Sequence, residues 1–224
     1  MPIRFFSTVM LRALLAGALL SSALGVSAQD VPGYPPLNPA TLLQGPYDRR
    51  ELALLPKYCY HTQIFRQFAP GGSDQQEINR WYAALGETYH HLHHYCWAMM
   101  KTNRAVLLAR DPKVKTFFLN DSLGEFDYVI EHSPTTFVLL PEILTKKAEN
   151  LLLLDRAPLA INALERAIEV KPDYWPPYAK LADHYKEAGD VERARKTLQS
   201  GLAANPGATA LSRRLESLGS APSR

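Results

Sequence analysis

Apolar residues recur at spacings of three and four along two long stretches of the chain. In the first stretch, which runs from Asp74 to Arg110, they are Trp81, Leu85, Leu92, Tyr95 and Met99. In the second stretch, from about residue 141 to residue 218, similar runs are separated by turn signals such as Gly189-Asp190. This spacing is that of an amphipathic helix with one face toward a core. The pattern therefore predicts an all-α chain.

The second stretch contains one residue pattern twice, at a spacing of 34 positions. Small residues recur in both copies, and they would let paired helices approach closely while larger residues fill the space around them. A proline closes each copy and would end the preceding helix. The matched positions are Leu144, Lys147, Ala148, Leu151, Ala160, Leu164, Ala167 and Pro172 in the first copy, and Tyr178, Leu181, Ala182, Tyr185, Ala194, Leu198, Gly201 and Pro206 in the second.

This period and these small residues resemble the tetratricopeptide repeat, a helix–turn–helix unit. The resemblance implies two units within residues 141–206, at about 141–174 and 175–208, whose antiparallel helix pairs stack into a right-handed solenoid. Residues 207–218 then read as a solvating end helix, which a stack needs because its last unit otherwise exposes apolar surface. We expect the tail 219–224 to be disordered.

Upstream of these units the pattern is weaker. Residues 74–134 carry partial matches, among them Leu85-Gly86 and Tyr89, and predict diverged helical hairpins with an insertion around Asp111-Pro112. Residues 29–73 form a different segment, in which six prolines before residue 57 forbid a long helix. We expect an extended proline-rich arm with short helical turns near its end, closed by a break at 70–73.

The first 28 residues resemble a Sec-type signal peptide. Arg4 and Arg12 flank a short apolar run, and Val26-Ser27-Ala28 supplies small residues for cleavage before Gln29. The run is shorter than the roughly 20 residues that a membrane-spanning helix needs. We therefore expect export to the periplasm or secretion, with no membrane span in the processed protein. The resemblance as a whole is to an exported bacterial tetratricopeptide-repeat protein.

The charge of the chain argues against two classes of partner. Without Arg4 and Arg12, the 25 basic residues fall to 23 against 22 acidic ones, a net charge near +1. No basic block occurs, so nucleic acids and anionic membranes are poor candidates.

The two cysteines, Cys59 and Cys96, lie in similar aromatic surroundings. In an oxidising compartment two cysteines more often pair than stay free, so we predict a disulfide; the alternative is two buried thiols that never meet. The chain has no C-x-x-C motif, which removes thioredoxin-like redox chemistry.

The histidines are the only candidates for chemistry. The run HHLHH at residues 90–94 could present two or three imidazoles, from His90, His93 and His94, to zinc or copper. The alternative is that these rings pack between helices or face water. Motifs of hydrolases, nucleotide-binding loops and calcium loops are absent, so we expect neither enzymatic activity nor a cofactor.

In the resembled family the first helix of each unit lines a binding groove, which implies a non-enzymatic adaptor for another protein, with an envelope or export-machinery component as partner. The groove would mix acidic and apolar groups and suit a segment with some positive charge. Two alternatives stay open: the groove is covered by the N-terminal arm, or the protein binds or delivers metal through the histidines. The predicted groove residues are Glu142, Thr145, Glu149, Leu152, Leu153, Ala179, Asp183, Lys186 and Glu187.

Overall fold

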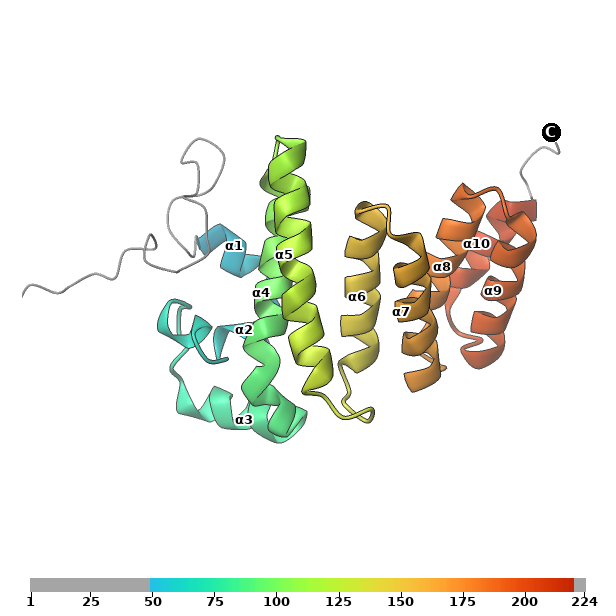
Figure 1. Cartoon of the computed structure of the whole chain (residues 1–224). Helices are drawn as coiled ribbons and strands as arrows, with labels where there is room; N and C mark the ends of the chain where they lie inside the picture. Colours follow the sequence, from blue (N-terminus) through green and yellow to red (C-terminus); the bar gives the residue numbers. More distant parts are fainter. Residues whose placement is uncertain (1–48, 220–224) are drawn as a thin grey trace, which may run out of the picture. The chain divides into compact units, whose positions relative to one another are not determined.

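A computed structural model describes residues 49–219, and within that range the chain is helical with no strand (Figure 1). The predicted all-α class is confirmed. The predicted signal peptide, residues 29–48 of the proline-rich arm and residues 220–224 of the tail lie outside the described residues. The elements are α1 (Arg49–Ala53), α2 (Lys57–Tyr60), η2 (Phe65–Gln67), α3 (Gln75–Leu85), η3 (Glu87–His91), α4 (Leu92–Asn103), η4 (Arg104–Leu108), α5 (Pro112–Glu131), α6 (Leu140–Leu153), α7 (Ala157–Val170), α8 (Pro176–Glu187), α9 (Val191–Ala204) and α10 (Thr209–Gly219).

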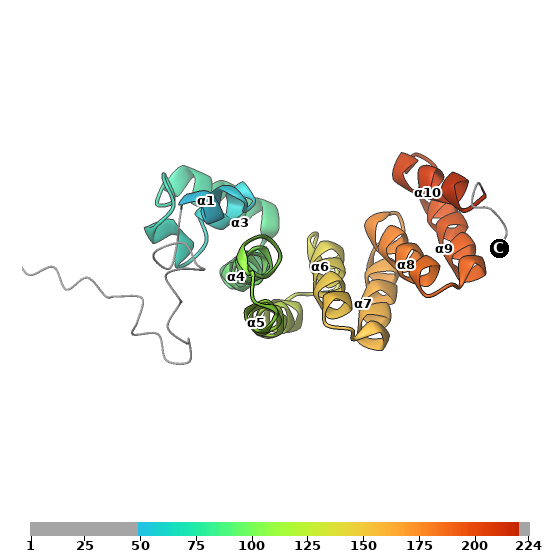
Figure 2. The ribbon, with the colours of Figure 1, turned by 90° about the horizontal axis from the view of Figure 1, so that it is seen from above.

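Helices that are neighbours in sequence pack as pairs: α4 with α5, α6 with α7, and α8 with α9, with α10 against α9 and α8. Figure 2 shows these pairs following one another along the chain. The first helices of successive pairs also touch, because α6 contacts α8 and α8 contacts α10. This arrangement is the stack of helix pairs that the repeated pattern predicts. Within residues 49–219, every helix is too short or too polar to span a bilayer.

The small residues of the repeat lie where the paired helices meet. Ala148 and Ala160 are fully buried between α6 and α7, and Ala182 and Ala194 occupy the matching places between α8 and α9. The turn between α8 and α9 also follows the sequence. Gly189 has a φ of 82°, which favours glycine, and the Asp190 side chain accepts a hydrogen bond from the backbone N–H of Arg193. Local signals and packing therefore agree throughout this part of the chain.

The connection between α4 and α5, where an insertion is expected, is short and helical. Residues Arg104–Leu108 form one π-helical turn, and Asp111 then caps α5 by accepting from the backbone N–H of Lys113. Pro112 stands in the first turn of α5, where its missing N–H costs little. The connection is thus a π turn and not an open loop.

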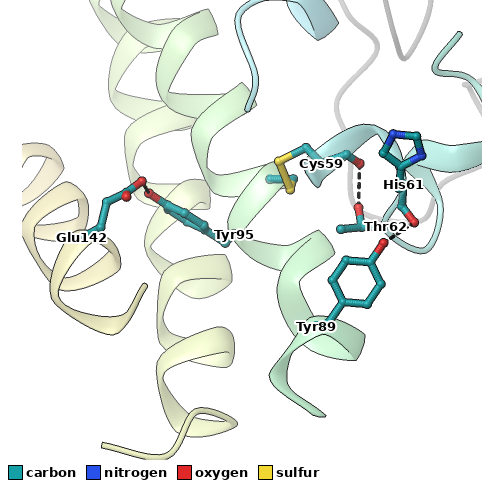
Figure 3. The surroundings of a disulfide bond; sticks show 7 residues. Cys59, His61, Thr62, Tyr89, Tyr95 and Glu142 are labelled. Atoms are coloured by element: carbon teal, nitrogen blue, oxygen red, sulfur yellow. Dashed lines mark hydrogen bonds between the residues drawn. A yellow bond between two sulfur atoms is a disulfide. The ribbon is translucent and has the colours of Figure 1, made fainter. Parts of the chain in front are cut away.

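Covalent and ionic links hold the short N-terminal elements onto α4. Cys59 on α2 and Cys96 on α4 form the predicted disulfide, with their Cα atoms 5.7 Å apart (Figure 3). In the chain-entropy account, a link across 37 positions contributes about 3–4 kcal/mol. At the other end of α4, Arg104 donates from Nε and Nη2 to both carboxylate oxygens of Glu51, and both side chains are buried.

Buried polar groups join the first two helix pairs. Asn150 on α6, which is fully buried, donates from Nδ2 to Thr102 Oγ1 on α4 and to Ser122 Oγ on α5, each at 2.7 Å. Lys101, 2% exposed, pairs with Glu125 at 2.7 Å and with Asp121 at 2.9 Å. A buried polar group without a partner is costly, so these bonds restrict how α4, α5 and α6 can pack.

Gly201 gives a test of this packing. A Cβ atom added there would lie 2.6 Å from Leu211 Cδ1 and 2.8 Å from Tyr178 Cγ. We expect Gly201→Ala to destabilise the protein by about 1–3 kcal/mol, because α9 cannot move away from both neighbours. The first unit has Ala167 at the matching position, so the cost comes from the neighbours and not from helix propensity.

The measurement is chemical denaturation, with Gly124→Ala on α5 as the matched control. No atom lies within 4 Å of a Cβ placed at Gly124, so this change should stabilise α5 by up to about 1 kcal/mol. Equal effects of the two substitutions would contradict the close contact at Gly201.

Candidate protein-binding face

The first helices α4, α6, α8 and α10 lie beside one another and are joined in sequence by side-chain bonds. Tyr95 on α4 donates from its hydroxyl to Glu142 Oε1 on α6 at 2.6 Å (Figure 3). Lys180 on α8 lies 2.9 Å from Glu149 Oε1 on α6. We call the surface formed by these four helices the first-helix face. It comprises the predicted groove on α6 and α8, extended by α10 and by α4, whose residues are all buried or half-buried.

Three acidic residues of this face, Glu142, Glu149 and Asp183, bond to neighbouring groups. Glu149 also accepts from Lys146 at 3.0 Å. Asp183 on α8 accepts from Nε and Nη2 of Arg214 on α10, at 2.9 and 3.0 Å. Because the carboxylates at 142, 149 and 183 all bond within the fold, the face offers less free negative charge than the sequence indicates.

Two of the predicted contact residues are not on the surface. Thr145 and Ala179 are 3% and 2% exposed, and Ala179 belongs to the apolar cluster formed by α8, α9 and α10. Thr145 further uses its hydroxyl to donate to the Pro141 carbonyl at 2.7 Å. The prediction that they contact a partner is therefore wrong. Both act in packing.

The other predicted residues of the face are accessible to different degrees. Leu152 is half-buried and Leu153 is 46% exposed at the end of α6. Lys186 and Glu187 are exposed at the end of α8. Leu153 is thus the large apolar side chain of the predicted set that a partner could cover.

Aromatic residues add to the face. Tyr174, half-buried just before α8, has its pKa raised to about 12, chiefly by burial and then by the carboxylates of Glu142 and Glu149. Its hydroxyl therefore stays protonated close to α6. Trp175 beside it is 37% exposed. Tyr95 itself is fully buried in the core, as its helical spacing predicts, and reaches α6 only through its hydroxyl.

The structure does not bring His90, His93 and His94 together as a metal site. His94 Nδ1 bonds Glu125 at 2.6 Å, and His93 Nδ1 donates to the His90 carbonyl at 3.1 Å. The His90 ring packs against Tyr82, with centroids 5.2 Å apart. No group of three His, Cys, Asp or Glu side chains in residues 49–219 is placed to hold a metal ion. His90 lies in the 3₁₀ turn η3, before α4 begins at Leu92, and the Nδ1 atoms of His93 and His94 are already used in these hydrogen bonds.

The histidines are nevertheless packed closely. The rings of His91 and His132 are stacked with centroids 4.6 Å apart, and those of His93 and His94 are 4.3 Å apart. Burial, followed by the neighbouring His94, lowers the pKa of His93 to about 4; Glu125 and the His90 carbonyl oppose this shift. The pKa of His91 is lowered in the same direction by burial and by His132.

These lowered pKa values predict acid sensitivity. Between pH 6.5 and about 4 the unfolded chain binds a proton at His93 and the folded chain does not, so the free energy of unfolding falls as the pH falls through this range. Allowing for partial exposure, we expect His93 to account for about 1–2 kcal/mol of this loss. Denaturation curves at pH 7 and pH 4.5 should show a smaller loss for His93→Gln than for the wild type. His184→Gln, on α8 and outside the cluster, should lose as much as the wild type; an equal loss in all three proteins would contradict the prediction.

Comparison with known proteins agrees with the predicted tetratricopeptide repeats. Residues 151–216 match the family model described as tetratricopeptide repeat, a range that runs from the end of α6 into α10. The chain is 30% identical over 87 residues to Protein STIP1 homolog of Dictyostelium discoideum. That alignment covers 39% of this chain and 15% of the relative, so the chain spans only a small part of that protein's length. With the 34-residue period and the stacked helix pairs, this match identifies residues 151–216 as tetratricopeptide repeats.

Proposed function

We propose that this protein is a non-enzymatic scaffold that binds another protein through its first-helix face. The observation that carries the proposal is the continuous row of α4, α6, α8 and α10, joined by side-chain bonds at each step, within a chain that contains tetratricopeptide repeats. Such stacks present extended surfaces suited to a partner segment. Nothing in the described residues favours the metal-binding alternative.

The chemistry of the face supports an apolar or amphipathic segment as the ligand. The carboxylates at 142, 149 and 183 already bond to a tyrosine, to lysines and to an arginine. A cationic segment would have to displace these partners, whereas Leu153 and Trp175 offer exposed apolar surface without such a cost. We infer that apolar anchors provide most of the affinity, with charge complementarity secondary.

We further propose that the protein acts outside the cytoplasm, in the periplasm or as a secreted protein, on a component of the envelope or export machinery. The signal-like N-terminal sequence supports this location. The disulfide between Cys59 and Cys96 also supports it, because such bonds persist in oxidising compartments.

The binding face can be tested with a photoreactive amino acid at Leu153, compared with the same group at Leu159. Leu159 is 55% exposed on α7, a second helix, and is therefore a control of similar exposure. We expect crosslinks to a discrete partner in cells from position 153 and not from position 159. Leu153→Asp should weaken the interaction with that partner at least tenfold, and Leu159→Asp should leave it unchanged.

Salt dependence separates the two kinds of ligand. If apolar contacts dominate, raising the salt concentration from 50 to 500 mM should change the dissociation constant by less than about threefold. A loss of binding at high salt would instead indicate a cationic partner segment. Equal crosslinking from both positions would contradict the face itself.

Export gives an independent prediction. In the native host, the protein should be recovered from the periplasm or the medium with Gln29 as its first residue. Thiol alkylation with and without prior reduction, read by mass spectrometry, should show both cysteines oxidised. Recovery of an unprocessed chain with free thiols in the cytoplasm would contradict the proposed location.

A further inference from the structure

A cleft outside the repeat units has the composition of an anion site. It has a volume of about 410 Å³ and lies between the loop after α2, the outer side of α3 and the turn η3. Its lining includes Arg66, His61, His90 and Gln63, and no Asp or Glu side chain lines it. The rings of Tyr82 and Tyr89 provide apolar walls. A volume of this size is in the range of small-ligand pockets.

Arg66 is the fixed positive charge of this cleft. It is exposed, and no carboxylate within residues 49–219 forms an ion pair with it. Its guanidinium lies close enough to Tyr89 to act electrostatically on that hydroxyl, although burial dominates and raises the pKa of Tyr89 to about 12. The Tyr89 hydroxyl therefore stays protonated and donates to the His61 carbonyl at 2.6 Å (Figure 3).

The backbone beside Arg66 is strained. Ile64 has φ 72° and ψ −62°, and the N–H of Phe65 donates to the Gln63 carbonyl at 2.9 Å, which together make a γ-turn. This conformation is rare, and for a β-branched residue it is unfavourable. It places Gln63 and Arg66 on either side of the turn, and both line the cleft. Strain of this kind persists only where surrounding contacts enforce it.

Those contacts are present on both sides of the turn. The Phe65 side chain is fully buried, which fixes the residue after Ile64. Gly72 packs against the backbone of this turn. A Cβ atom added at Gly72 would lie 2.6 Å from Arg66 Cα. The Gly72 carbonyl accepts from His61 Nδ1 at 3.2 Å, which fixes the ring and leaves its Nε2 unused by this bond.

The disulfide completes this frame. Thr62 donates from its hydroxyl to the Cys59 carbonyl at 2.8 Å, and Cys59 is bonded to Cys96 on α4 (Figure 3). The loop that carries His61 and Arg66 is thus anchored covalently to the core. A rigid frame of this kind reduces the entropy lost when a ligand binds.

We propose that this cleft binds a small carboxylate that carries an apolar group. The guanidinium of Arg66 can donate two parallel hydrogen bonds to the two carboxylate oxygens. Imidazole and amide groups of His61, His90 and Gln63 supply further hydrogen bonds, and the tyrosine rings cover the apolar part. Glu87, whose carboxylate accepts from the Tyr82 hydroxyl and lies 4.0 Å from His90 Nε2, is not among the lining residues.

The test uses the full processed chain and three probes of known chemistry: benzoate, its neutral analogue benzamide, and inorganic phosphate. Binding is followed by isothermal titration and by amide chemical shifts in ¹⁵N-labelled protein. We expect saturable binding of benzoate at millimolar concentrations, with the shifts concentrated in residues 61–90. Benzamide should bind at least tenfold more weakly, because it cannot accept the charge-assisted pair of hydrogen bonds.

Arg66→Gln should weaken benzoate binding at least tenfold without changing the denaturation midpoint, since the side chain is exposed. Arg110→Gln is the matched control, an exposed arginine outside the cleft. The proposal is overturned if benzoate does not bind, if benzamide or phosphate binds equally well, or if the two arginine variants behave alike. The outcome is independent of the first-helix face, because no residue of the cleft belongs to α6, α8 or α10.

Discussion

The close approach of paired helices at small residues is the constraint on which the rest of the stack depends. Ala148, Ala160, Ala182 and Ala194 are all buried to within 2% exposure at the contacts between paired helices. Because only alanine methyl groups lie between the helices there, the helices come close together. The larger residues on either side of these contacts can then pack against each other. A single pair cannot bury its apolar faces alone, so each pair is stabilised by the next. The end helix α10 closes this series by placing Leu211 and Leu218 against α8 and α9.

The first helix pair joins the stack by a different kind of interaction. Between α4, α5 and α6, buried polar groups accompany the apolar contacts, including Asn150 with Thr102 and Ser122, and Lys101 with Glu125. Such groups tolerate few alternative arrangements, because any displacement leaves a desolvated donor or acceptor unpaired. The contact between α4, α5 and α6 therefore stabilises the fold and also favours one arrangement of these helices. It also carries the disulfide-bonded loop, and with it the Arg66 cleft, on the same frame as the repeats.

The candidate face shows which of its features could be predicted from the sequence and which could not. The resemblance to the repeat family placed Glu142, Glu149 and Asp183 on one surface, and the bonds from α4, α8 and α10 agree with that placement. It did not show that these acids bond to Tyr95, Lys180 and Arg214, because those residues lie 31 to 47 positions away in the sequence. Thr145 and Ala179 belong to the same predicted set but are buried. Spacing also did not show that the Nδ1 atoms of His93 and His94 would bond to the His90 carbonyl and to Glu125.

By itself the sequence indicated the helical class, the repeat and its period and the turn at Gly189-Asp190, and it favoured the pairing of the two cysteines over separate thiols. All of these depend on interactions between near neighbours, on a pattern repeated at fixed spacing, or on the presence of only two thiols in the chain. The tertiary structure alone decided which charges remain free, which residues of the face are covered, and how a strained turn at Ile64 forms beside Arg66. Those features arise where segments distant in sequence meet, and the free energy of each contact depends on a partner that local pattern does not specify.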